Sequence, residues 1–299
     1  MAEAKGFPDW ERLAQNLRVE RGLLAGLDVL SDIPIVVFKG GALTRRLYGD
    51  LRKRASADND LMVRHRDAGR ALDRLLAHGY QPAAGLDAER ALARTGQVAL
   101  FPGGDFDAPS LDLHAEPFSR NFFQVDEDYL WSRLEVVDIH GRSIPTFDAP
   151  LALTHMVAHF FQHLLEVSQL QHIGWAWDRF GRELDRAELV EVAERTSGVA
   201  ALEYALGLAA EYGFVRGPRP ECSSARARLA LRCFGRRWLE SQPRGSARGL
   251  VAVLVADPAR LPRALGRGLF PEQDELTSIY GEGSSVSLLF QHWRHRIFD

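Results

Sequence analysis

The spacing of hydrophobic residues divides the chain into an α/β first half and a helical second half. In residues 9–30, leucines recur with a period near 3.6 residues, which predicts an amphipathic helix. A β-branched run at 33–38 predicts a buried strand, and a helix is expected at 42–48, directly after a glycine pair. The other elements expected in this half are strands at 57–63, 98–101 and 110–114 and a helix at 66–79.

Beyond residue 150 the pattern is helical throughout. Residues 144–147, which contain a proline, are expected to form an extended linker between the halves. We therefore predict an α+β protein, with a small mixed-sheet α/β domain and its N-terminal helix in residues 1–148 and a mostly helical domain in 149–299. Helices are expected at 151–167, 170–184, 186–197 and 200–212, with more helix around 223–240 and 247–266.

Composition narrows the class of protein. Of the 299 residues, 46% are hydrophobic and 26% are charged, and the net charge is −3, which excludes disordered and collagen-like chains and argues against a DNA-coating protein. Two cysteines do not make a disulfide framework, and neither a signal peptide nor an apolar run of about 18 residues is evident. Arginine far outnumbers lysine, which favours a GC-rich bacterial genome. We expect a cytoplasmic protein without a membrane partner.

Two aspartates in the predicted strand 57–63, Asp58 and Asp60, are the first candidate chemistry. Side chains two residues apart on a strand face the same way, so these carboxylates are expected about 7 Å apart. They repel by about 2 kcal/mol at an effective dielectric of about 20, so solvent, an arginine or a cation must offset the repulsion. Carboxylates are typical ligands of Mg²⁺. Taken alone, the pair is more typical of exposed acids at a strand end.

A glycine turn precedes this strand in the chain. Gly40 and Gly41 follow a buried strand and open a helix, where backbone N–H groups and the helix dipole favour a phosphate. Lys39 lies at the same turn and is one of only three lysines among 37 basic residues. The alternative is that the glycines merely permit a tight turn. Arg54, in a predicted loop before Asp58, either neutralises phosphate charge or pairs with a surface acid.

A third acid, Asp112, lies in the predicted strand 110–114. Asp112 and His114 face the side opposite to Leu111 and Leu113. The plainer interpretation is a half-buried strand whose polar face meets water. However, an anion-binding turn, a pair of acids and a later acid occur together in one short α/β unit, which favours a phosphate and metal site.

These residues resemble the opening of the uncharacterised bacterial nucleotidyltransferase-like family, within the polymerase-β-type nucleotidyltransferase superfamily. The shared pattern is a strand, Lys-Gly, a small-residue helix ending in tyrosine, an arginine, and an Asp-x-Asp strand. The clear similarity covers about residues 20–120 and a looser one reaches about 185. It is carried here by Val36 to Leu43, Tyr48, Arg54, Asp58, Asp60, Leu61, Val63 and the later Leu111 to His114, and more loosely by helical residues that include His155, His159, Trp177 and Asp178.

The resemblance implies a Mg²⁺-dependent nucleotidyltransferase, which moves an NMP from an NTP to an acceptor hydroxyl and releases pyrophosphate. The acceptor implied is a small molecule, a peptide or a tRNA. For catalysis and for one or two Mg²⁺ ions, the resemblance implies Asp58, Asp60 and Asp112. For nucleotide binding it implies Lys39, Gly40, Gly41 and Arg54. The acceptor cleft, one wall of which the helical domain would form, is expected to contain His114, His155, His159 and Asp178.

Two features depart from the family pattern. Asn59 stands where the family has an aliphatic residue, and a buried asparagine without partners costs free energy, so we expect the strand to lie near a sheet edge there. The turn Gly40-Gly41 is a shorter form of the superfamily's glycine turn. The departure at Asn59 leaves open a second function, that of a non-catalytic nucleotide- or peptide-binding accessory protein on the same fold.

Two features of the second half carry further alternatives. His155, His159 and His163 form one stripe on the predicted helix 151–167. The stripe fits interdomain packing best, and its alternatives are the acceptor cleft and the metal site of a phosphohydrolase, which needs further converging ligands. Nine arginines lie in residues 216–248, which fits a solvated helix surface or an RNA-binding face.

Overall fold

The structure is a computed structural model of the chain, and it forms two compact units. Unit 1 comprises residues 1–117 and 125–152, and unit 2 comprises residues 118–124 and 153–299. The residues that the structure describes are 9–118, 123, 125–181, 184–196, 198–242, 246–256, 284 and 286–289.

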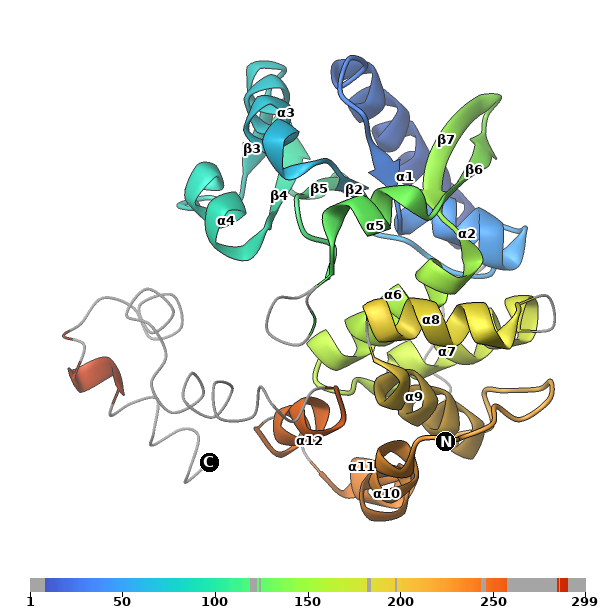
Figure 1. The fold of residues 1–299 in the computed structure, drawn as a ribbon. Coiled ribbons are helices and arrows are strands. Elements are labelled where there is room, and N and C mark those ends of the chain that lie inside the picture. Colours follow the sequence, from blue (N-terminus) through green and yellow to red (C-terminus); the bar gives the residue numbers. More distant parts are fainter. Residues whose placement is uncertain are drawn as a thin grey trace. The chain divides into compact units, whose positions relative to one another are not determined.

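Unit 1 is built on a five-stranded mixed sheet in the order β1-β2-β5-β4-β3 (Figure 1). Strands β2 (Asp58–Met62) and β5 (Ser110–His114) are parallel neighbours, and the other adjacent pairs are antiparallel. This sheet, followed by a helical part, confirms the predicted fold class. The remaining elements are β1 (Val36–Val37), β3 (Tyr80–Pro82), β4 (Gln97–Pro102), α1 (Asp9–Val29), α2 (Gly40–Tyr48), α3 (His65–Ala77), α4 (Ala88–Thr95), α5 (Glu127–Ser132), β6 (Leu134–Ile139) and β7 (Arg142–Phe147).

The two faces of the sheet have different chemistry because side chains alternate along each strand. Leu61 of β2 and Leu111 and Leu113 of β5 are at most 1% exposed and belong to one hydrophobic core. Leucines of α1, α3 and α4 complete that core, so these helices cover the apolar face. The intervening positions of β2 and β5 carry the acids, which therefore lie on the opposite face.

Local sequence signals explain the ends of several helices. Helix α4 begins where the Asp87 carboxylate accepts a hydrogen bond from the Arg90 backbone N–H, and it ends at Gly96, whose φ of 74° is the left-handed conformation that glycine tolerates. Helix α2 ends in the same way at Gly49, with φ 61°. These caps hold the helices at the lengths that packing on the sheet requires.

One sequence-based expectation in unit 1 is wrong. The expected linker at 144–147 is part of β7, which forms an antiparallel hairpin with β6. His140 and Gly141 form its turn with φ values of 54° and 79°, and two positive φ values are what a tight hairpin turn requires. The proline at 145 obscured this strand, although Pro is accepted where a strand has only one partner.

The strand does lie near a sheet edge at Asn59, as expected, although β2 is an internal strand between the short edge strand β1 and β5. Strand β1 pairs only with Leu61 and Met62, and the glycine turn lies beside Asn59 instead. The Asn59 side chain is fully buried, and its amide donates to the Val19 carbonyl of α1 at 2.8 Å. A partner from a distant helix therefore satisfies the Asn59 amide N–H, whereas the buried Oδ1 atom has no hydrogen-bond partner among the described residues.

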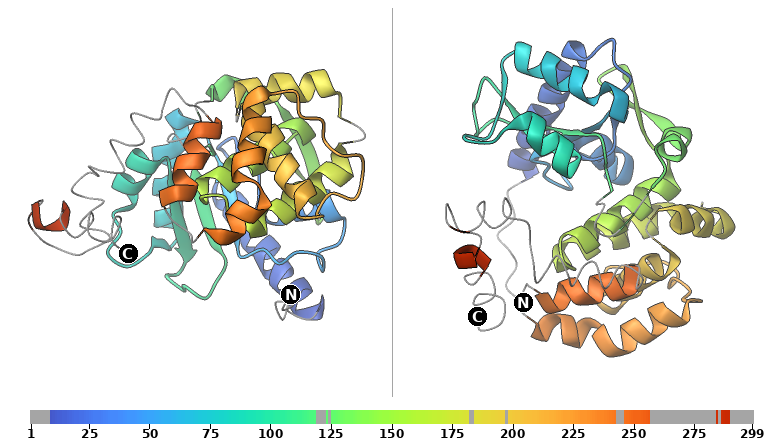
Figure 2. Two further views of the ribbon diagram at one scale, coloured as in Figure 1. Left: turned by 90° about the horizontal axis from the view of Figure 1, so that it is seen from below. Right: turned by 60° about the vertical axis from the view of Figure 1, so that its left-hand side comes forward.

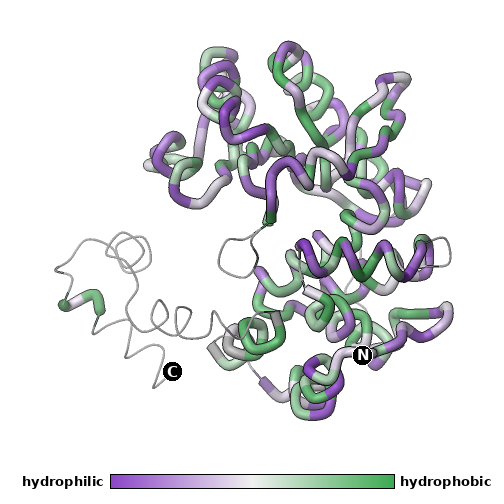
Figure 3. Tube along the Cα trace, in the orientation of Figure 1, coloured by the Kyte–Doolittle hydropathy of each residue, from purple (hydrophilic) through white to green (hydrophobic). Residues whose placement is uncertain are grey.

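Unit 2 is helical in its described residues. Helix α9 (Val199–Glu211) is largely buried, and it packs against α7 (Val167–Phe180), α8 (Arg186–Arg195), α10 (Ala225–Phe234) and α12 (Ser246–Ala256) (Figure 2). Hydrophobic residues predominate along α9 and α12 (Figure 3). The chain enters the unit through α6 (Ala149–Gln162), and α11 (Arg236–Ser241) follows α10.

Residues 257–266, where more helix was expected, lie outside the described part of the chain. Among the helices that the structure does describe, none is long and apolar enough to cross a membrane.

Candidate active site

The candidate site is on the polar face of the sheet in unit 1. Asp60 of β2 and Asp112 of β5 are register partners on adjacent parallel strands. Asp58 precedes Asp60 by two residues and pairs in register with Ser110. The structure therefore brings the three predicted acids together on neighbouring strands, on one face.

Lys39 and Gly40 form the turn that leads from β1 to α2, beside β2. Gly40 has φ 60°, and a Cβ built at this position would lie 2.6 Å from the Asp58 carbonyl oxygen. Only glycine fits both the left-handed backbone and this close approach. The N-terminus of α2 is thereby held against the strand that carries the acids.

Asp60 is the most strongly held of the three acids. Its side chain is 3% exposed, and its Oδ1 atom accepts hydrogen bonds from Lys39 Nζ and His114 Nε2, each at 3.0 Å. Burial disfavours the charged carboxylate, but the positive charge of Lys39 and the bond from His114 outweigh it and hold the pKa of Asp60 well below its usual range. Asp60 is therefore an ionised carboxylate whose orientation is fixed.

Asp58 and Asp112 have the opposite electrostatics. Burial, followed by repulsion from Asp60, raises the pKa of both carboxyl groups. The Ser110 hydroxyl donates to Asp112 Oδ1 at 2.8 Å, which partly offsets this effect and orients Asp112. The site thus places two acids that resist ionisation beside one that ionises readily, so an added cation would be stabilised here.

The loop before β2 is fixed from α1 by Asn16, which sequence reasoning missed. The fully buried Asn16 amide donates to the carbonyls of Leu51 and Arg54, and its oxygen accepts from the Ser56 N–H at 2.9 Å. Arg54 itself reaches Thr44 of α2 with its Nη1 atom 3.4 Å from the hydroxyl. Its positive charge lowers the pKa of Asp58, against the larger effect of burial. The role of Arg54 in nucleotide binding stays a prediction.

A buried carboxylate on α1, Glu20, supports the other side of the glycine turn. It pairs with Arg45 of α2 and with His140 of the hairpin turn, the latter at 2.8 Å. A Cβ on Gly41 would lie 3.0 Å from Glu20 Cγ, so α2 packs closely on α1 here. No local sequence signal identifies Glu20, because its partners lie 25 and 120 residues away.

The donor atoms present fit a divalent cation. One possible metal-ligand atom from each of Asp60, Asp112 and His114 lies within 4.8 Å of the other two. The second Asp60 oxygen, Oδ2, is buried and has no hydrogen-bond partner among the described residues. A buried carboxylate oxygen without a partner is costly, and an oxygen-binding cation such as Mg²⁺ would satisfy it. Asp58 is not a member of this converging group, although it is electrostatically linked to it.

His114 lies in the acid cluster itself. Since an ionised carboxylate only accepts, His114 Nε2 is the donor to Asp60, and the ring packs edge-on against Phe38 with centroids 5.0 Å apart. The alternation of residues along 110–114 does place His114 on the face of Asp112. However, only the register between β2 and β5 shows that it meets Asp60.

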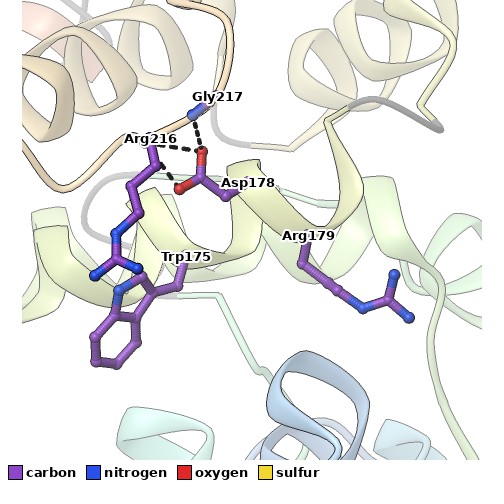
Figure 4. Close-up of a pocket in the computed structure, with 5 residues that line it drawn as sticks. All are labelled: Trp175, Asp178, Arg179, Arg216 and Gly217. Carbon is purple, nitrogen blue, oxygen red and sulfur yellow. Dashed lines mark hydrogen bonds between the residues drawn. The ribbon is translucent and has the colours of Figure 1, made fainter.

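The other predicted cleft residues are in unit 2. On α6, His155 is 2% exposed and packs edge-on against Phe118, and the Nε2 atoms of His159 and His163 are 3.0 Å apart. Among the described residues, the histidine stripe belongs to no group of three converging metal donors. On α7, the Asp178 carboxylate accepts from the backbone N–H groups of Arg216 and Gly217 (Figure 4). Their role at an acceptor cleft stays a prediction.

A mixed sheet with acids on parallel strands, beside a Lys-Gly-Gly helix start, is consistent with a nucleotidyltransferase-like fold. The sequence profile of the uncharacterised nucleotidyltransferase family matches residues 12–213, more than half of the chain. The chain therefore belongs to the uncharacterised nucleotidyltransferase family, and the predicted family is confirmed.

A solved structure is also similar to this chain. It is that of an antigenic nucleotidyltransferase-like protein from Paracoccidioides brasiliensis, at 17% sequence identity and a TM-score of 0.33, and the match covers 63% of this chain and 95% of that one. Among curated protein sequences, none matches the chain.

Proposed function

We propose that the protein is a Mg²⁺-dependent nucleotidyltransferase that moves a nucleoside monophosphate from an NTP to an acceptor hydroxyl and releases pyrophosphate. One observation carries the proposal: Asp60 and Asp112 are register partners on parallel strands, with the lysine that begins α2 bonded to Asp60. Family membership supports a nucleotide substrate. The acceptor would be a small molecule, a peptide or a tRNA.

Mg²⁺ would be held by Asp60 and Asp112, with Asp58 beside them. Bound there, the metal would neutralise triphosphate charge and favour the ionised form of the acceptor hydroxyl. Lys39, the N–H groups of Gly40 and Gly41, and Arg54 add positive charge at the N-terminus of α2, where the pyrophosphate leaving group would need it. His114 would orient Asp60 through its bond to Oδ1.

The reaction requires one bond to form and one to break. The acceptor oxygen bonds to the α-phosphorus, and the bond from this phosphorus to the bridging oxygen of the β-phosphate breaks. The acceptor proton passes to Asp112 or to solvent.

A non-catalytic accessory protein is the competing function. The departure at Asn59 leaves it open, because this polar residue stands where the family has an aliphatic one. Asn59 donates to Val19 and leaves the acids on the other face in register, so this residue does not distinguish the two functions.

Label transfer tests the proposal. The full chain is incubated with Mg²⁺ and each NTP labelled at the α-phosphate, together with extracts of small molecules, peptides and small RNA, and both label transfer and pyrophosphate are measured. Transfer that Asp112→Asn abolishes and Asp73→Asn, an exposed acid on α3, leaves intact would support the proposal. Saturable NTP binding with neither transfer nor pyrophosphate in any mixture would contradict it and favour the accessory protein.

A further inference from the structure

A pocket of about 360 Å³ lies in unit 2, against helix α7 (Figure 4). It is an open depression of the surface rather than an enclosed cavity. The pocket is lined by Trp175, Asp178 and Arg179 of α7 and by Arg216 and Gly217 of the segment after α9. It contains a large aromatic ring and two arginines, and none of these residues belongs to the acid site of unit 1.

The segment that carries Arg216 is fixed to α7 by several independent contacts. Asp178 accepts from the N–H groups of Arg216 and Gly217 at 2.9 and 2.7 Å. Trp177 Nε1 donates to the Pro218 carbonyl at 2.9 Å. A Cβ on Gly174 would lie 2.6 Å from the Phe214 carbonyl oxygen, so the segment also packs closely on the helix. These contacts hold the backbone at Arg216 against α7.

Two arginines, Arg179 and Arg216, bring positive charge to this pocket. The Asp178 carboxylate accepts hydrogen bonds from two backbone N–H groups, which stabilise its negative charge, and the two arginines of the pocket outnumber this one acid. Among the described residues, no carboxylate pairs with the Arg216 guanidinium, which Figure 4 shows reaching toward the Trp175 indole. Arg179 lies one turn farther along α7 than Trp175 and adds a second positive charge.

We propose that this pocket binds a nucleotide group, with its flat base against Trp175 and its phosphate at Arg216. Bases stack on indole rings whatever their identity, and guanidinium groups bind phosphate through paired hydrogen bonds. The pocket supplies both groups side by side. The proposal goes beyond the transferase reaction and does not rest on it, because every lining residue lies in unit 2.

The test uses the full chain in EDTA, so that no divalent ion supports NTP binding at the acids of unit 1. AMP, adenosine, inorganic phosphate and a 5′-phosphorylated adenosine hexanucleotide RNA are titrated by calorimetry. AMP should bind more tightly than adenosine or phosphate. Arg216→Ala should weaken AMP binding by about tenfold and Trp175→Ala by about fivefold. Arg219→Ala, which removes an exposed arginine of the same segment, is the matched control and should leave it within about twofold.

The probes also distinguish the source of the nucleotide. Equal affinity for AMP and the hexanucleotide would assign a free nucleotide, whereas tighter, salt-sensitive binding of the hexanucleotide would assign RNA. Either result supports the proposal if Arg216→Ala and Trp175→Ala weaken binding of the probe. The proposal is overturned if neither probe binds at about 10 mM, if phosphate alone binds as well as AMP, or if both variants bind like the wild type. Asp58→Asn/Asp60→Asn should leave AMP binding to this pocket unchanged. The pocket proposal and the transferase proposal can therefore fail independently of each other.

Discussion

Asp60 and Asp112 are register partners on parallel strands, yet their surroundings move their pKa values in opposite directions. Asp60 is stabilised as a carboxylate by Lys39 and His114, whereas Asp112 and Asp58 are destabilised by burial and by the charge of Asp60. In the absence of a cation, the folded chain therefore holds two acids whose ionisation is less favourable than that of an ordinary aspartate.

This arrangement predicts how stability depends on pH. A raised pKa gives stability that is complete below the ordinary aspartate pKa of about 4 and is lost as pH rises through the folded-state value. The contribution of Asp60 has the opposite sign: it is present above about pH 4 and lost below it. We expect Asp58 and Asp112 to lower stability in EDTA as pH rises above about 4, and Mg²⁺ to restore more of it at pH 7 than at pH 5. Urea unfolding at several pH values, with and without Mg²⁺, measures this.

Asp58→Asn isolates one of these groups. In EDTA at pH 7 the variant should be more stable than the wild type, with a Tm about 2–4 °C higher, because it removes a charge that is repelled by Asp60. With Mg²⁺ this advantage should shrink or reverse. A lower Tm than the wild type in EDTA would contradict the electrostatic description of the site.

Lys39 should be important for stability as well as for nucleotide binding. Lys39→Met leaves the buried Asp60 carboxylate without its cation, so we expect a loss of about 2–3 kcal/mol in the free energy of unfolding. Mg²⁺ should stabilise this variant more than the wild type. Lys53→Met, in the loop before β2, is the control and should change stability by less than about 0.5 kcal/mol. Equal effects of the two substitutions in urea unfolding would show that the Lys39–Asp60 contact is not significant.

Gly40 and Gly49 have almost the same φ, so substituting each with alanine separates the cost of backbone strain from the cost of a steric clash. Gly49→Ala meets no atom within 4 Å and should cost only the strain of a positive φ, about 1 kcal/mol. Gly40→Ala also drives its Cβ into the Asp58 carbonyl, so we expect a larger loss of stability and weaker Mg²⁺-dependent NTP binding. Thermal unfolding and calorimetry of both variants check this. Identical behaviour would mean that α2 does not need to approach β2 closely.

His114 should tune the metal site through Asp60. His114→Asn removes the bond that fixes Asp60 Oδ1, and losing such an orienting bond typically weakens metal affinity by about 10–100-fold. His78→Asn, at the exposed end of α3, is the control. Mn²⁺ binding followed by electron paramagnetic resonance provides the affinities. Wild-type affinity in His114→Asn would exclude a positioning role for this histidine.

Much of the fold was predictable because its signals are local. Leucine periodicity identified α1, and alternation along 110–114 placed Asp112 and His114 on one face, as the register with β2 confirms. The β6–β7 hairpin was missed because Pro145 interrupts its pattern and because its turn uses His140, a residue uncommon at positive φ.

The parts of the site that could not be predicted depend on partners far apart in the sequence. The hydrogen bond from Asn59 to Val19 joins β2 to α1, and the contacts of Asn16 join α1 to the loop before β2. These contacts span about 40 residues or fewer, but no spacing rule in the sequence predicts them. The same holds for His114 and Asp60, which are 54 residues apart and meet only because β2 and β5 pair in one particular register.

Calorimetric titration of the four NTPs with Mg²⁺ tests the central claim most directly. The wild type, Asp58→Ala/Asp60→Ala and the surface control Asp73→Ala are compared, each first shown to be folded. We predict saturable, Mg²⁺-dependent binding of at least one NTP to the wild type and to the control, and none to the double variant. Binding that survives in the double variant, or that is absent from a well-folded wild type, would contradict the assignment of a metal–triphosphate site to these acids.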